Sequence, residues 1–387
     1  MPATKVADVT PISLNEIKEI GVVSGPCVSI LIPFETAPDQ VEQNRVRLRH
    51  AVDAAKKLLT ERGVEADRAH SMMHAIHEIA EGLKGDGQGL AVYCAGDFCR
   101  AYRLLEPPPE SVTVAEHFYI KPLIPLLTAD RQFYILALSQ RHAHLLRCTG
   151  HSSEEVELPE SVPKTLWEDK HTDQPDHTQA DRSSAGPDVG AMKGVAFTTN
   201  TDREDRPEYL AHFYKHLSEG VTALLKDEGA PLVVAGVDYE IAAFKRVNTY
   251  PQLVEEAVHG AADGLKGGEL HKRALDAMQT YSETPLKAAL ERYERGGIER
   301  ESSTLKDIVK AAYEGRVLDL IVAENAQYMG SFDQATHDVK GHKQPEPGDE
   351  DLLNAAALQT LMHAGQVFVV PANKVPHGAP AVAVFRY

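Results

Sequence analysis

Short runs of β-branched and aliphatic residues, separated by stretches whose apolar residues recur three and four positions apart, constrain the fold of this chain most strongly. The clearest runs are CVSILIP (27–33), FYILALS (133–139) and LDLIVA (318–323). The stretch 41–62 has the helical spacing, with Leu48, Val52 and Leu59 recurring on one side. Buried strands that alternate with amphipathic helices predict layered α/β domains of the mixed α+β class.

The length of 387 residues exceeds what a single core usually supports, so the sequence predicts several domains. Breaks in the pattern near Leu127 and Gln279 divide the chain into domains at 1–127, 128–279 and 280–387. The segment 159–206 has no periodicity, and we expect a long, acidic, functional loop there. Helices are expected at 207–225, 251–259, 269–279, 284–295, 305–314 and 351–364.

The charge balance limits the classes of partner. Lys and Arg number 40 against 57 Asp and Glu, and the net charge of -17 opposes non-specific binding to nucleic acid or to an anionic membrane. We therefore expect no DNA or membrane partner, and any RNA contact must be local. The four cysteines include no CxxC pair, which argues against a disulfide framework or a zinc ribbon. With neither a signal-peptide pattern nor a membrane-length apolar run, we expect a cytoplasmic protein.

The order of segments resembles the archaeal and eukaryotic class-one peptide-chain release factors and Pelota, through the bacterial branch of that superfamily. In the first domain, CVSILIP, NRVRLRHAV (44–52) and LAVYC (90–94) resemble the opening strand, the codon-reading helix and a later strand of the release-factor N-terminal domain. FYILALS, HAHLLRC (142–148) and PLVVAG (231–236) resemble the ribonuclease-H-like middle domain. LKDIVKAAYEGRVLDLIVAEN (305–325) resembles the opening of the C-terminal domain, which has the kink-turn-binding ribosomal protein fold.

The resemblance implies three domains of these types and a role in translation. The partners it implies are the ribosome or its RNA and, through the C-terminal domain, a translational GTPase. It implies no cofactor.

Two motifs of true release factors are absent. Where the middle-domain loop would carry Gly-Gly-Gln, this chain has Gly190, Ala191 and Met192, and a thioether has no N–H with which to hold a hydrolytic water. The loop is also acidic, which opposes insertion among RNA phosphates. The stop-codon motif Asn-Ile-Lys-Ser is replaced by DQVE (39–42) before the first helix. The sequence therefore implies neither hydrolysis by the family mechanism nor codon reading.

The basic residues of the first helix are the predicted RNA-binding residues. They are Arg45, Arg47, Arg49, Lys56 and Lys57. The spacings of four and seven between Arg45, Arg49 and Lys56 predict a shared helix face, which we expect to lie opposite the apolar stripe of Leu48, Val52 and Leu59 and to contact rRNA phosphates. The alternative is a solvated face on which Asp53 and Glu42 pair with these cations.

Other arrangements of reactive side chains carry less weight. Histidines recur at helical spacing at positions 70, 74 and 77 and again at 212 and 216, but no cysteine or HExxH pattern accompanies them, so we expect no metal site. A two-metal nuclease is not expected, because the strand FYILALS carries no carboxylate. Neither GxSxG nor a phosphate-binding glycine loop occurs in the chain, and no catalytic residue is assigned.

These observations favour a non-catalytic, ribosome-associated, release-factor-like protein in translation quality control, rescue or dormancy. Two alternatives stay open. One is a peptidyl-tRNA hydrolase that uses the divergent loop in another way. The other is a protein-interaction scaffold that does not bind the ribosome.

Overall fold

The structure is a computed structural model. It describes residues 10–11, 14–35, 41–82, 88–129, 132–139, 142–159, 162–165, 206–226, 228–261, 267–297, 300–343, 346 and 348–387. The segment with Gly190, Ala191 and Met192 lies outside these residues, as does most of the predicted loop. Within the described part of the chain, no helix combines the length and the apolar character needed to cross a membrane.

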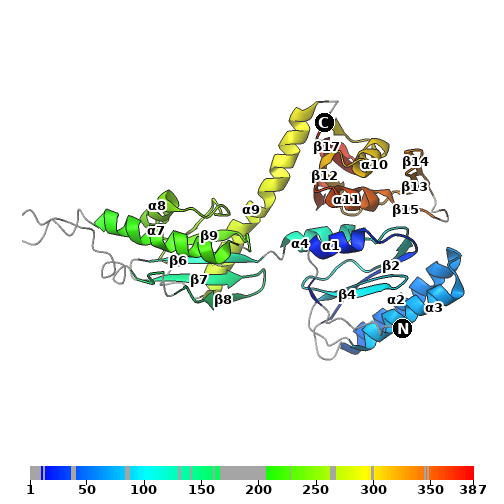
Figure 1. Ribbon diagram of the computed structural model, residues 1–387, viewed down its shortest axis with the longest axis horizontal. Coiled ribbons are helices and arrows are strands. Elements are labelled where there is room, and N and C mark those ends of the chain that lie inside the picture. Colours follow the sequence, from blue (N-terminus) through cyan, green and yellow to red (C-terminus); the bar gives the residue numbers. More distant parts are fainter. Residues whose placement is uncertain are drawn as a thin grey trace, which may run out of the picture. The chain divides into compact units, whose positions relative to one another are not determined.

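The chain forms two compact units. Unit 1 combines residues 1–130 with residues 285–387, and unit 2 contains residues 131–284. Both units carry helices on β-sheets, which confirms the predicted mixed α/β class (Figure 1). The predicted boundary at Leu127 is close to the junction at residue 130, whereas Gln279 lies inside helix α9 (Gly267–Gly296). The three-domain division stays a prediction.

The N-terminal part of unit 1 is a five-stranded sheet in the order β1-β4-β3-β2-β5. The strands are β1 (Thr10–Pro11), β2 (Cys27–Pro33), β3 (Gly89–Ala95), β4 (Phe98–Leu104) and β5 (Ser111–Ala115). Alternate residues of β2 point to opposite faces: Val28 and Ile30 pack against α2 (Val41–Glu61) and α3 (Ala66–Gly82), while Leu31 joins the core that contains α1 (Leu14–Gly21). Because both faces are covered, the predicted strand is apolar along its length.

The β3–β4 hairpin contains a cysteine pair that was not predicted from the sequence. Cys94 and Cys99 are opposite each other in the ladder, with their Cα atoms 4.1 Å apart, and form a disulfide. The connecting turn uses Gly96 at a φ of 56°, a left-handed conformation that favours glycine. No spacing motif marks such a pair, because it depends on the hairpin register. The low cysteine count argued against a framework of several disulfides, and this single bridge within one hairpin is not such a framework.

The C-terminal part of unit 1 has a second sheet in the order β11-β17-β12-β16. Its strands are β11 (Glu301–Ser302), β12 (Val317–Ala323), β16 (Gln366–Val370) and β17 (Ala381–Phe385). Helices α10 (Leu305–Tyr313) and α11 (Leu352–Met362) cover one face, and Ala289 and Tyr293 of α9 pack on the other. A small separate sheet contains β14 (Asp338–Gly341), β13 (Met329–Asp333) and β15 (Glu350–Asp351).

One hydrophobic core joins the two parts of unit 1. It contains side chains of α1 and β3 together with side chains of α10, α11 and β17. Helix α1 comes so close to α11 that a Cβ on Gly21 would lie 2.8 Å from the side chains of Leu358 and Met362. The short helix η1 (Lys121–Leu123) and α4 (Ile124–Ala129) follow the N-terminal sheet. The segment that leads into η1 lies at the junction between the two parts.

Unit 2 is a five-stranded sheet in the order β10-β9-β6-β7-β8. The strands are β6 (Phe133–Leu138), β7 (Ala143–Cys148), β8 (Ser153–Val156), β9 (Leu232–Gly236) and β10 (Val258–His259). Strands β6, β9 and β10 are parallel, whereas β6, β7 and β8 form an antiparallel meander. Helices α7 (Arg206–Leu225) and α8 (Asp238–Val247) cover one face, and α9 covers the other.

Two of the helical predictions were wrong. Residues 251–259 form no helix, because their backbone is used by strand β9: Leu232 donates to Gln252 O at 2.9 Å, and Val254 donates to Leu232 O at 2.8 Å. The helices predicted at 269–279 and 284–295 are one helix, α9, which continues through Pro285. Helix α8 was not predicted at all.

Candidate functional site

Helix α2 carries the predicted basic residues and is anchored at its N-terminal end. The Asn44 side chain accepts a hydrogen bond from Glu35 N at 2.9 Å and donates one to Glu35 O at 2.8 Å. Leu48, Ala51, Ala55 and Leu59 are buried against the sheet. The helix therefore has a fixed orientation on the sheet and beside α3, with which it shares a core.

Arg47 differs from the other four basic residues. Its guanidinium donates to Pro33 O and to the Glu35 carboxylate, both at 3.2 Å, and the side chain is partly buried. These contacts tie α2 to the end of β2, so Arg47 has a structural use that the sequence did not reveal.

The other basic side chains of α2 are exposed. Arg45 lies 3.4 Å from Glu42, and Lys57 lies 3.7 Å from Glu61, with both pairs open to solvent. Ion pairs this exposed contribute about 0 to 1 kcal/mol and exchange easily. Among the described residues, no ion pair is found for Arg49 or Lys56.

Arg45, Arg49 and Lys56 share one side of α2, as predicted, but this side borders the apolar face instead of lying opposite it. Val52 follows Arg45 by seven residues, which places the two only about 20° apart around the helix axis. Val52 is half-buried, and the buried face centres on Leu48 and Ala55. The predicted opposition was therefore wrong. We name the exposed row of Arg45, Arg49 and Lys56 the basic row.

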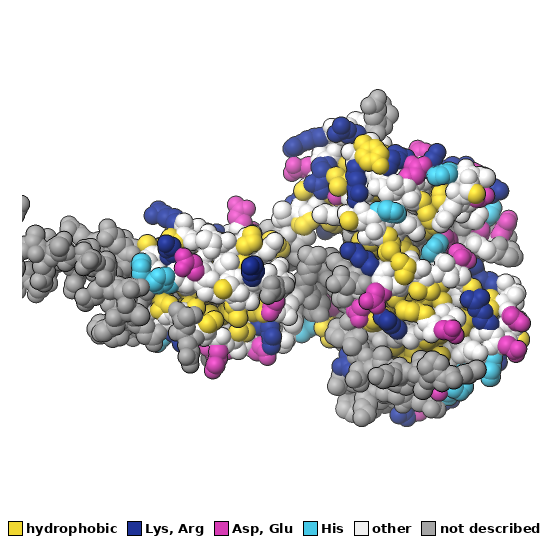
Figure 2. Space-filling model, viewed as in Figure 1, with side chains coloured by type: hydrophobic (Ala, Val, Ile, Leu, Met, Phe, Trp, Pro, Cys, Tyr) yellow, Lys and Arg dark blue, Asp and Glu magenta, His cyan; other side chains and the backbone are white. Residues whose placement is uncertain are grey.

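The basic row is a local feature on an acidic protein. In the view of Figure 2, Lys and Arg side chains are interspersed with Asp and Glu side chains, and no extended patch of one sign is visible. Screening limits the reach of exposed charges to about 8–10 Å in physiological salt, so acidic groups elsewhere on the chain do not cancel the row.

Reactive side chains in the described residues give no sign of a catalytic centre. Cys27 and Cys148 are the free cysteines, and burial raises the pKa of each thiol to about 12, which keeps both protonated. His70, His74 and His77 are exposed on α3, where His74 faces Glu78 at 3.7 Å. No group of three or more His, Cys, Asp or Glu side chains is arranged to hold a metal ion within the described part of the chain.

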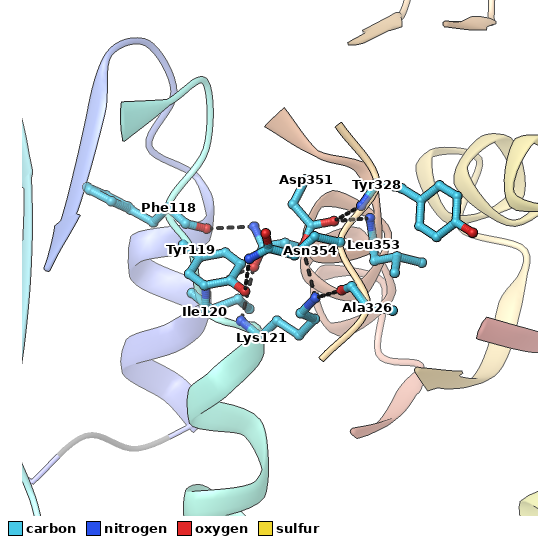
Figure 3. Close-up of polar contacts among 10 residues, drawn as sticks. Phe118, Tyr119, Ile120, Lys121, Ala326, Tyr328, Asp351, Leu353 and Asn354 are labelled. Carbon is cyan, nitrogen blue, oxygen red and sulfur yellow. Dashed lines mark hydrogen bonds and ion pairs between the residues drawn. The ribbon is translucent and has the colours of Figure 1, made fainter. Parts of the chain in front are cut away.

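A buried polar junction connects the two parts of unit 1, and Figure 3 shows its centre. Asn354, in the first turn of α11, accepts hydrogen bonds from Ile120 N at 2.8 Å and Lys121 N at 3.0 Å, and donates to Phe118 O at 2.9 Å. One side chain thus satisfies three backbone groups that precede and begin η1. These backbone groups precede Asn354 by more than 230 residues in the sequence.

Lys121 is the charged group of this junction. Its side chain has 0% exposure, and its ammonium contacts Ala326 O and lies 2.9 Å from the Asp351 carboxylate. Asp351 is the N-cap of α11 and also accepts from Leu353 N and Tyr328 N, each at 3.1 Å. The ion pair is therefore buried and hydrogen-bonded, the arrangement in which loss of one partner is costly.

Two further buried carboxylates precede Asp351. Glu350 lies 2.9 Å from His117, and Asp349 lies 2.9 Å from the His342 ring through both of its oxygens. Burial lowers the pKa of His117, but the hydrogen bond to Glu350 and the charges of Glu350 and Glu116 outweigh it, so this pKa lies above its usual value. Each member of the run 349–351 therefore has its own cationic or imidazole partner.

Little in the sequence pointed to this junction. No local pattern marks the run Asp-Glu-Asp at 349–351 or Lys121 as buried. Buried charges are rare for these residue types, and only the pairing of segments distant along the chain makes them tolerable. The one usable signal was the N-cap position of Asp351 before a long apolar helix.

Several solved structures are similar along nearly the whole length of this chain. The crystal structure of the archaeal translation termination factor aRF1 is 16% identical, with 97% of this chain and 99% of that chain covered and a TM-score of 0.24. Ribosome-bound archaeal Pelota is 13% identical, with coverages of 98% and 95% and a TM-score of 0.39. Saccharomyces cerevisiae Dom34 is 8% identical, with coverages of 98% and 94% and a TM-score of 0.38.

The family comparison is more specific. No curated protein matches the sequence. Residues 132–316 match the family model described as bacterial archaeo-eukaryotic release factor family 3. The match spans unit 2 and the first strand and helix of the C-terminal sheet region. It confirms the resemblance drawn from the sequence to the bacterial branch of the archaeal and eukaryotic release factor superfamily.

Proposed function

We propose that this protein binds the ribosome as a non-catalytic factor in translation quality control, rescue or dormancy. The match of residues 132–316 to a release factor family is the observation that carries the proposal. Action on ribosomes implies a cytoplasmic protein. The resemblance also implies a translational GTPase as partner of the C-terminal part, and we include that partner in the proposal.

The basic row supports a contact with ribosomal RNA. Arg45, Arg49 and Lys56 are exposed on a helix whose backbone is fixed by its packing on the sheet. Little backbone conformational freedom is therefore lost when these side chains contact phosphates. Binding would release counterions from the RNA, and this release favours association even for a protein of net charge -17. The row would position the protein, since contacts with phosphates carry no sequence information.

The sequence supports the absence of peptide release. A hydrolytic water at the peptidyl-tRNA ester would need a donor and an acceptor held in place, and Gly190, Ala191 and Met192 supply no side-chain amide. The buried cysteines are protonated and cannot act as nucleophiles in its stead. A ribosome-binding protein without this chemistry would act by occupancy of a ribosomal site.

The test is co-sedimentation of the purified full chain with bacterial 70S ribosomes through a sucrose cushion at low and high salt. We expect the protein in the ribosomal pellet at low salt and a marked decrease in the pellet at high salt. Recovery only in the supernatant at every salt concentration would overturn the proposal in favour of the interaction scaffold. A companion assay measures peptide release from programmed ribosomes. Release that depends on Met192 would replace the proposal with the hydrolase alternative.

A further inference from the structure

The two cysteines of the β3–β4 hairpin have different surroundings. Cys94 has 0% exposure and belongs to the core beneath α2 and α3, whereas Cys99 is partly exposed and packs against that core. The ladder places the two residues directly opposite each other, with their Cα atoms 4.1 Å apart. The disulfide therefore joins one residue that contacts solvent to one that does not.

The hairpin holds the two cysteines together even without the bond. The disulfide closes only the turn 95–98, and beyond it the strands stay paired as far as Gly89 and Leu104. The stabilisation that a disulfide gives by restricting the unfolded chain is smallest for short loops. The fold therefore has little need of a permanent bridge at this place, and the bond can open without separation of the strands.

The surroundings of the pair also suit the reduced state. The Cys94 sulfur lies 3.7 Å from Met72 O in α3, within reach of a weak S–H···O hydrogen bond once the sulfur carries a proton. The buried thiol would thus have a partner after the bond to Cys99 is broken. Cys99 is partly exposed, so water can solvate its thiol.

We propose that Cys94 and Cys99 are a reversible redox pair that exchanges with low-molecular-weight thiols and disulfides of the glutathione type. Cys99 is the residue that these molecules attack, because it is the member of the pair that contacts solvent. The cytoplasmic location, which rests on the proposed function, would expose the pair to such thiols. The redox chemistry itself depends only on the hairpin.

Thiol–disulfide exchange accounts for both directions. In oxidation, the Cys99 thiol loses its proton, and the thiolate attacks one sulfur of oxidised glutathione while the other sulfur leaves with the bonding electron pair. The Cys94 thiol then loses its proton, and its sulfur attacks the Cys99 sulfur and displaces the second glutathione thiolate. The two thiolates take up the two protons, so one protein disulfide and two reduced glutathiones result. Reduction is the reverse and begins with attack of a glutathione thiolate on Cys99.

The other two cysteines serve as internal controls. Cys27 and Cys148 are buried and free, and burial raises the pKa of each thiol to about 12. Since the thiolate is the reacting form, both should stay reduced in the folded chain at every ratio of reduced to oxidised glutathione.

The experiment equilibrates the purified full chain anaerobically in glutathione buffers from fully reduced to fully oxidised. Each sample is quenched with acid, unfolded and alkylated with N-ethylmaleimide, and the labels are located by mass spectrometry. We expect labels only at Cys27 and Cys148 in oxidising buffers and at all four cysteines in reducing buffers, with an unchanged far-UV circular dichroism spectrum. Oxidised glutathione should modify Cys99 in Cys94→Ser at least about tenfold faster than Cys94 in Cys99→Ser.

Three results would overturn the proposal. The first is labelling of all four cysteines in the oxidising buffers. The second is a bond that resists reduced glutathione and dithiothreitol until the chain unfolds, which would identify a permanent bridge. The third is equal rates of modification in the two variants. If Cys94→Ser does not fold, alkylation of the folded, reduced wild type decides the same point, because Cys99 should react before Cys94. These measurements use no ribosomes, so their outcome is independent of whether the protein binds them.

Discussion

The buried ion pair of Lys121 and Asp351 gives the sharpest prediction about stability. In Lys121→Met the aliphatic stem is kept, so packing changes little, but the ammonium is removed. Asp351 then keeps only its backbone donors, Leu353 N and Tyr328 N, and Ala326 O loses its partner. Removal of one member of a buried ion pair costs about 3–5 kcal/mol. Because two donors still reach the carboxylate, we expect the lower end, about 3 kcal/mol.

The companion variant separates the cost of the orphaned charge from the contribution of the pair. Asp351→Asn retains an oxygen that accepts from the same backbone donors and removes the negative charge. The double variant Lys121→Met with Asp351→Asn should therefore recover most of the stability, to within about 1–2 kcal/mol of the wild type.

Urea unfolding followed by far-UV circular dichroism measures these free energies. Lys57→Met is the control, because Lys57 faces Glu61 across 3.7 Å with both side chains exposed, and its removal should cost less than about 1 kcal/mol. If Lys121→Met lowered the free energy of unfolding by no more than Lys57→Met does, the stabilising role of the buried pair would be refuted. A double variant no more stable than the single one would show that the orphaned carboxylate is not the cause.

Three further predictions address the junction and the chemistry. Asn354→Leu should lower the free energy of unfolding by about 2–4 kcal/mol in urea titrations, because three buried backbone groups lose their partner. The stability difference between the wild type and His117→Gln should be largest below pH 6.5 and shrink as the pH rises through the elevated pKa of His117, as melts from pH 5.5 to 8.5 would record. The wild type and Met192→Ala should release no peptide from programmed ribosomes.

The local elements could be predicted from the sequence to a large extent. The predicted strand at 27–33 has the same bounds as β2, and the predicted helix at 41–62 ends one residue earlier, because apolar spacing reports directly which side of an element is buried. Residues 251–259 were misassigned because their apolar positions fit a helix, while strand β9 supplies backbone partners that no local pattern reveals.

Contacts between segments that are far apart in the chain could not be predicted from a single sequence. The shared core of unit 1 brings residues near 20 and 120 against residues near 310 and 355, and nothing in the local patterns encodes this pairing. The same holds for Lys121 and Asn354, which looked ordinary until their partners were known. Conversely, the spacing of the basic residues was enough to predict the basic row. Its predicted position opposite the buried face was wrong, because Val52 lies on the same side of the helix as Arg45.

The salt dependence of ribosome binding by an Arg45→Ala, Arg49→Ala, Lys56→Ala variant tests the central claim most directly. Removal of one cation that touches a phosphate should reduce the slope of log affinity against log salt by about 0.7–0.9, so the triple variant should bind more weakly with a slope smaller by about 2–3. Its thermal melt should stay close to that of the wild type, because the three side chains are exposed. An unchanged affinity and slope in a normally folded variant would contradict the proposed contact between the basic row and ribosomal RNA.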